Sequence, residues 1–176
     1  MKKKWLIPLA LGLALLWLNR PGRNQAMRLP TGNVPMPAWT MRDLDGRPVA
    51  STNFAGKVLI LNFWATWCPP CLAEIPDLKA FHAAHEAEGV VVLGAAIDED
   101  GAAKVKPFTE RNRINYPVLV ADPAVQDLFG GVTGVPTTFI VDRVGRMVAR
   151  YHGPLSEAEL NRAIAPLLAP TATPPR

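Results

Sequence analysis

The chain has 176 residues, of which 49% are hydrophobic and 19% charged, a balance that fits one globular domain and excludes wholesale disorder. Its two cysteines are too few for a disulfide framework or a four-cysteine zinc site. The formal net charge is +4, but six of the 19 basic residues precede residue 29, where no acidic residue occurs. The rest of the chain is therefore mildly acidic, and the high isoelectric point does not predict nucleic-acid binding.

Residues 1–19 are predicted to form an uncleaved membrane signal-anchor. Three lysines at 2–4 precede an uncharged apolar run at 5–18. As a helix this run spans about 21 Å against a hydrocarbon core of about 30 Å, and flanking basic side chains can extend to the interfaces. A cleaved secretory signal fits less well, because Asn19-Arg20-Pro21 follows the run in place of a small-x-small cleavage site. A buried core helix is the third interpretation.

Residues 20–35 are predicted to be a flexible tether, since they are rich in proline and glycine and show little apolar periodicity. The last residues, 169–176, are rich in proline and threonine and are predicted to be a disordered tail. The folded domain is therefore expected to span residues 36–168.

Within the domain, predicted strands and helices alternate. Segments 38–41 and 47–50 flank the turn signal Asp45-Gly46, which predicts an N-terminal β-hairpin. The continuous apolar runs 57–64 and 90–97 are typical of buried strands. This alternation predicts an α/β fold with a mostly parallel central sheet flanked by helices, to which a final hairpin adds antiparallel strands at one side. Helices are expected at 69–88, 102–112, 123–129 and 156–168, and further strands at 116–120, 137–141 and 147–152.

Cys68 and Cys71 are the candidate redox pair, placed where the strand 57–64 gives way to a helix. This spacing allows a disulfide with little backbone movement. Because Cys68 lies at the positive end of the helix dipole, we expect it to attack as a thiolate and Cys71 to resolve the mixed disulfide. Pro69 and Pro70 withhold two amide donors from that thiolate. A structural disulfide or half of a metal site is the alternative. With no other cysteine and no ligand-like histidine spacing, the sequence predicts no metal or cofactor.

Two segments together resemble a known family. Asn62-Phe63-Trp64-Ala65-Thr66-Trp67-Cys68-Pro69-Pro70-Cys71 resembles the active site of the thioredoxin superfamily, and more narrowly the TlpA/ResA-type branch of extracytoplasmic thiol–disulfide oxidoreductases, with AhpC/TSA–redoxin-like domains and CcmG/DsbE relatives. The segment Gly134-Val135-Pro136-Thr137-Thr138-Phe139-Ile140-Val141-Asp142 agrees. The resemblance covers about residues 36–168. It implies a thioredoxin-like fold with a mixed central sheet and a strand and helix inserted within 89–120.

The resemblance also assigns roles around the two cysteines. Pro136 matches a cis-proline beside the dithiol, and Val135 presents backbone groups that can hold a substrate strand. Trp67, Pro69 and Pro70 form the supporting active-site loop.

Three further positions distinguish this chain within the superfamily. Glu74 matches a glutamate that exchanges protons with the second thiol, although a solvated helix glutamate is the alternative. Asn62 stands where thioredoxin has a buried aspartate. Thr137 stands where CcmG-type cytochrome c biogenesis proteins have a glutamate, which favours the more general branch.

The resemblance implies an enzyme held by its N-terminal helix on the periplasmic side of the bacterial cytoplasmic membrane. Its expected partners are disulfide-containing proteins, including apocytochrome c, and a membrane thiol transporter resembling CcdA or DsbD that supplies electrons. Two other function classes stay open. A peroxiredoxin needs a threonine three residues before its cysteine, where this chain has Ala65. A copper-carrying assembly factor uses C-x-x-x-C with a distant histidine, for which His152 is the candidate.

Overall fold

The computed structural model describes residues 27–29 and 33–168, so the predicted signal-anchor and C-terminal tail lie outside the described residues. Within the described ranges, no helix combines the length and the apolar character that crossing a membrane requires.

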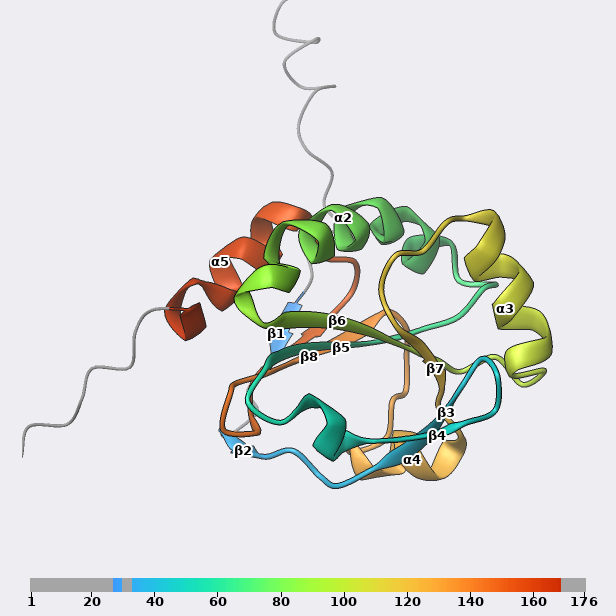
Figure 1. Ribbon diagram of the computed structural model, residues 1–176, viewed down its shortest axis with the longest axis horizontal. Coiled ribbons are helices and arrows are strands. Elements are labelled where there is room, and N and C mark those ends of the chain that lie inside the picture. The colour runs from blue at the N-terminus through green and yellow to red at the C-terminus, as the bar shows by residue number, and fades with distance from the viewer. Residues whose placement is uncertain (1–26, 30–32, 169–176) are drawn as a thin grey trace, which may run out of the picture.

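A mixed sheet forms the centre of the domain (Figure 1). Strand β5 (Val58–Trp64) is wholly buried and pairs in parallel with β6 (Val90–Ala96), which pairs in parallel with β7 (Val118–Val120). On its other side, β5 pairs antiparallel with β8 (Thr137–Val141), which forms a hairpin with β9 (Arg146–His152). The mixed sheet that the resemblance implies is confirmed, whereas the mostly parallel sheet expected from the alternation alone is wrong, since the remaining described pairs are antiparallel. Strand β8 returns to the side of β5 and runs in the opposite direction to it. The periodicity of strands and helices in the sequence does not reveal this direction.

The N-terminal hairpin is confirmed. It consists of β3 (Thr40–Asp43) and β4 (Pro48–Ala50), and β3 also pairs with β7 at the far edge of the sheet. The carboxylate of Asp43 accepts hydrogen bonds from the amides of Asp45 and Arg47, which closes the turn. A 3-10 turn, η1 (Ser51–Phe54), then leads into β5.

Part of the segment predicted to be a flexible tether is strand. Strands β1 (Met27–Leu29) and β2 (Val34–Pro35) both pair antiparallel with β9. These strands have two or three residues each and interrupt a proline- and glycine-rich stretch, so they leave no periodic pattern in the sequence. They form because β9 would otherwise present an unpaired edge of backbone donors and acceptors.

Helices cover both faces of the sheet, with α2 and α5 on one side and α4 on the other (Figure 1). The predicted helix at 69–88 is α2 (Pro69–His85), which is followed by a 3-10 turn, η2 (Glu86–Glu88), and by Gly89 in the left-handed conformation. The other helices are α3 (Ala102–Arg111), α4 (Pro123–Leu128) and α5 (Glu157–Leu168). The segment 89–120 contains β6, α3 and β7.

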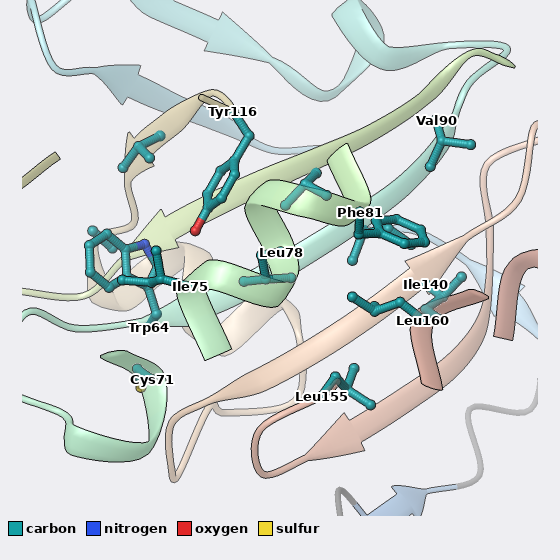
Figure 2. Close-up of a cluster of buried hydrophobic side chains, with 14 of the residues drawn as sticks. Trp64, Cys71, Ile75, Leu78, Phe81, Val90, Tyr116, Ile140, Leu155 and Leu160 are labelled. Atoms are coloured by element: carbon teal, nitrogen blue, oxygen red, sulfur yellow. The ribbon is translucent and has the colours of Figure 1, made fainter. Parts of the chain in front are cut away.

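Successive side chains of β5 enter two cores. Val58, Ile60 and Trp64 face α2 and α5, while Leu59, Leu61 and Phe63 face α4 and the hairpin. The two cysteines belong to the first of these cores, and Figure 2 shows Cys71 at the edge of its packed side chains. The redox pair is therefore held by the core that lies between the sheet and helices α2 and α5.

Candidate active site

The junction between β5 and α2 is held by the carboxylate of a residue just beyond β6. Asp98, just beyond β6, accepts hydrogen bonds from the Thr66 amide at 3.0 Å and from the Thr66 hydroxyl at 2.5 Å. Its side chain is fully buried, and the Lys104 ammonium lies 3.9 Å away. Thr66 is two residues before Cys68, so this contact sets where the active-site loop leaves the sheet.

Cys68 is the N-cap residue of α2 and is joined to Cys71 by a disulfide, with their Cα atoms 5.3 Å apart. Pro69 and Pro70 occupy the first two helical positions, where proline fits because those amides have no partner within the helix. The first amide available is that of Cys71, which donates to Cys68 Sγ at 3.3 Å. One backbone donor therefore faces the sulfur of Cys68, where a chain without prolines would offer more.

A loop from the far end of the chain lies against Cys68. The peptide bond between Val135 and Pro136 is cis, as the resemblance implies. The Val135 carbonyl oxygen lies 3.6 Å from Cys68 Sγ, although 67 residues separate the two in sequence. The structure thus brings together Cys68, Val135 and Pro136.

Glu74 is buried rather than solvated, with 2% of its surface exposed. Its Oε1 accepts from the Asn62 amide group at 2.8 Å, and its Oε2 accepts from the Leu155 backbone amide at 3.0 Å. Burial raises the pKa of Glu74 to about 8, a rise that the two hydrogen bonds oppose and nearby Asp77 assists. Because Glu74 follows Cys71 by three positions, both lie on one face of α2.

Asn62 connects Glu74 to the strand that follows the cis-proline. Besides donating to Glu74, its amide group donates to the Thr138 hydroxyl at 2.9 Å. The position that holds an aspartate in thioredoxin thus holds a donor that fixes the carboxyl group of Glu74. The titratable carboxyl group near the cysteines therefore comes from Glu74 on helix α2, whereas in thioredoxin it comes from the strand.

Trp67 is an exposed aromatic side chain at the site, with 58% of its surface accessible. Beside it opens a groove of about 810 Å³, formed by Trp67, the loop 97–101, Lys104, residues 120–123 and Gln126. Four acidic side chains and one lysine line this groove. A polypeptide that approaches the dithiol from this side meets a negatively charged surface.

This arrangement can exchange a dithiol for a disulfide. A sulfur at a helix N-terminus can act as a thiolate nucleophile, and a second cysteine three residues later can displace the bound partner. A carboxyl group with a pKa of about 8 is close in acidity to a thiol of the usual pKa of about 8.5, which is the match that proton exchange between Glu74 and the second thiol requires.

The comparisons with known proteins agree with this geometry. The AhpC/TSA family model matches residues 33–150. The chain belongs to the AhpC/TSA family. The thiol-disulfide oxidoreductase ResA of Geobacillus thermodenitrificans is 32% identical to it over 127 residues, 72% of each protein. The thiol:disulfide interchange protein HelX of Rhodobacter capsulatus is 39% identical over 118 residues, 66% of this chain and 64% of HelX.

A solved structure gives the same result for the fold. The crystal structure of a thiol:disulfide interchange protein of the thioredoxin family from Chlorobium tepidum superposes with a TM-score of 0.71. The two sequences are 34% identical, and the match covers 80% of this chain and 100% of the Chlorobium tepidum chain. The family member described here is therefore a TlpA/ResA-like thiol–disulfide oxidoreductase with a thioredoxin-like fold, as the sequence predicts.

Two residues linked to the other function classes have defined contacts. Thr66 is the threonine nearest to the peroxiredoxin-type position, and its hydroxyl donates to Asp98, just beyond β6. His152, the candidate histidine for a copper carrier, contacts the Thr137 hydroxyl through Nδ1 at 3.2 Å.

Sequence reasoning missed the roles of Asp98 and Leu155. Asp98 belongs to the acidic run Asp98-Glu99-Asp100, a composition typical of a solvated loop, yet it is buried against Thr66. The available signal was its position directly after a buried strand, next to the strand that precedes the cysteines. No signal marked Leu155, because its contribution to the Glu74 site is a backbone amide.

Proposed function

We propose that this protein is a membrane-anchored, extracytoplasmic reductant of protein disulfides. The observation that carries the proposal is the surroundings of the dithiol. One backbone amide donates to Cys68 Sγ, and Glu74 is buried on the Cys71 side. The scarcity of donors disfavours the thiolate, and Glu74 adds negative charge beside the dithiol once its carboxyl group ionises near pH 8. Both effects stabilise the disulfide relative to the dithiol and lower the reduction potential.

The proposed cycle begins with the reduced protein. The Cys68 thiolate attacks a sulfur of the substrate disulfide, a mixed disulfide forms, and one substrate sulfur leaves as a thiolate. Cys71 then loses its proton to Glu74 and attacks Cys68, which releases the second substrate sulfur. The substrate gains two electrons, its two thiolates take up one proton from Glu74 and one from solvent, and the protein is left with the Cys68–Cys71 disulfide.

Each turnover therefore requires two electrons from a donor. The donor we propose is a membrane thiol transporter of the CcdA or DsbD kind, and the first substrate to test is the disulfide of apocytochrome c. An extracytoplasmic reductant needs such a supply because its surroundings are oxidising.

The position of β1 supports an anchor near the active site. Met27 pairs with His152, and His152 pairs with Thr137, the residue after Pro136. Two strand spacings separate Met27 from Thr137, about 10 Å. The nine steps from Leu18 to Met27 span at most about 30 Å. An anchor at 1–19 would thus keep the active-site end of the sheet close to the membrane.

A redox titration of the protein against glutathione and dithiothreitol tests the direction of electron flow. We expect a potential of about −250 mV or below, at which the protein reduces ordinary protein disulfides. A potential near about −120 mV would make it a disulfide donor and overturn the reductant proposal.

The location is tested on the protein isolated from bacterial membranes. We expect the intact mass, with the first 19 residues retained, and we expect protease added to spheroplasts to digest the domain. A mass lacking about 25 N-terminal residues, the usual scale of a cleaved signal, would contradict the anchor. Protection from protease in intact spheroplasts would contradict the extracytoplasmic location.

A further inference from the structure

His152 lies against the loop that faces Cys68. A Cβ atom built on Gly134 would stand 2.7 Å from His152 Cε1, so the imidazole ring occupies the space that any larger residue at 134 would need. Gly134 therefore serves as the surface on which the ring packs, two residues before Pro136.

The hydrogen-bond directions in this contact can be assigned. The Thr137 hydroxyl lies 2.7 Å from the Gly134 carbonyl oxygen, which can only accept, so the single hydroxyl hydrogen is used there. His152 Nδ1, at 3.2 Å from the same hydroxyl, must then be the donor. The ring thus carries hydrogen on Nδ1, and its donor fixes the orientation of the Thr137 hydroxyl.

The loop is held at both ends by the end of β9. At one end, His152 acts through Thr137 on the Gly134 carbonyl, and at the other, the Gly153 amide donates to the Pro136 carbonyl at 2.9 Å. Between these two fixed carbonyls lies Val135, whose own carbonyl oxygen is 3.6 Å from Cys68 Sγ. A change at His152 can therefore reach the reacting sulfur without touching it.

We propose that His152 is a positioning residue of the exchange site: through Thr137 and Gly134, it holds the Val135 carbonyl against Cys68 Sγ. A carbonyl oxygen so placed accepts from the thiol and repels the thiolate, so it tunes the reactivity of Cys68. It also keeps the backbone of Val135 in place for a substrate strand. This role goes beyond the exchange activity and does not depend on the direction of electron flow.

The test uses three variants of the full-length protein. His152→Ala removes the donor. His152→Asn places an amide donor near the position of Nδ1, while His152→Gln places it near that of Nε2, which makes these two a matched pair. The pH dependence of Cys68 alkylation by iodoacetamide is measured on the Cys71→Ser background, and insulin reduction is measured with both cysteines present.

In His152→Ala, we expect the midpoint of the alkylation profile to fall by about 0.5 pH unit, because the thiolate is released from the carbonyl. We expect kcat/KM for insulin to fall about tenfold, because the substrate-facing backbone is no longer held. His152→Asn should restore both values, and His152→Gln should not. A merely structural histidine would lower the melting temperature and leave the alkylation midpoint unchanged, and that outcome overturns the proposal. Equal behaviour of the Asn and Gln variants also overturns it.

A second pair of variants covers the case in which His152→Ala does not fold. Thr137→Val keeps the shape of the side chain and removes the hydroxyl, whereas Thr137→Ser keeps the hydroxyl. The valine variant should reproduce the shifted alkylation midpoint, and the serine variant should match the wild type. An unshifted midpoint in Thr137→Val contradicts the proposed relay.

Discussion

Cys68 and Cys71 share one disulfide, but the two sides of that bond have different neighbours. On the Cys68 side lie a backbone carbonyl from the Val135 loop and the exposed ring of Trp67. On the Cys71 side lies Glu74, sealed from solvent with a pKa raised to about 8 by burial. Total exposure barely separates the cysteines, at 3% and 1%. The Cys68 side of the bond is therefore suited to meeting a partner, and the Cys71 side to handling a proton.

The strongest test of this division removes one sulfur at a time. Either serine variant should lose turnover by on the order of 10³-fold or more, since each removes a reacting atom. Cys71→Ser should accumulate partners in mixed disulfides with Cys68, because nothing resolves them. Non-reducing gels of cells expressing each variant measure this. Trapping by Cys68→Ser alone would reverse the assigned roles.

The proton-handling side is tested by Glu74→Gln. We expect the resolution step to slow by about 10²-fold, because the variant cannot take the Cys71 proton. The rate–pH profile should also lose its inflection near pH 8. Stopped-flow tryptophan fluorescence during insulin reduction follows the step. Glu110→Gln, at an exposed position on α3, is the control, and an unchanged resolution rate in Glu74→Gln would remove Glu74 from the mechanism.

The same carboxyl group predicts how stability depends on pH. Its folded pKa is raised from 4.5 to about 8, so the folded state keeps a proton that the unfolded state releases. The contribution to stability is therefore fully present below about pH 4.5 and is lost as pH rises to about 8. Urea unfolding of the oxidised protein across this window should show falling stability, and Glu74→Gln should flatten the slope. An identical slope in the variant would mean that other groups cause it.

Removing the contact between Asp98 and Thr66 is expected to have a smaller effect, on stability. Asp98→Ala leaves the Thr66 amide and hydroxyl without their acceptor, which should cost about 2 kcal/mol of stability. The neighbouring Glu99→Ala, at an exposed position, should stay within about 0.5 kcal/mol of the wild type. Denaturant unfolding of the pair measures the difference, and equal losses would show that Asp98 holds nothing.

The mildest change is expected on the partner-facing surface. Trp67→Ala should raise KM for a protein disulfide a few-fold, roughly 1 kcal/mol, because the exposed ring offers contact area to a polypeptide. Reduction of glutathione disulfide should be unchanged, since a small disulfide needs only the sulfurs. A parallel loss with both substrates would show that Trp67 acts on the dithiol itself.

Local patterns in the sequence predicted the parts of the site that depend on neighbouring residues. The C-x-x-C spacing at a strand–helix boundary gave the redox pair and its place at the helix N-terminus. The resemblance gave the cis bond before Pro136. Glu74 followed from its spacing to Cys71, and its burial resolved the choice between a solvated and a buried carboxyl.

Local sequence patterns could not predict the pairings between segments that are distant in the sequence. The contact of Thr66 with Asp98 joins residues 32 apart and exists because β5 and β6 are neighbours. The antiparallel insertion of β8 beside β5 depends on which edge the returning chain takes, and periodicity carries no such information. The pairing of β1 with β9 involves three residues whose partner is a backbone edge.

Cys68 is both the N-cap of α2 and a redox atom, and this double role couples folding to oxidation state. A thiolate accepts the Cys71 amide more strongly than a disulfide sulfur does, so the cap strengthens when the bond is reduced. In a thermodynamic cycle, a substitution that stabilises the reduced over the oxidised fold by about 1.4 kcal/mol raises the potential by about 30 mV. Melting curves of the two redox forms thus become a measure of electron affinity, and a residue that stabilises the first turn of α2 more in one redox form than in the other shifts the potential at which this protein works.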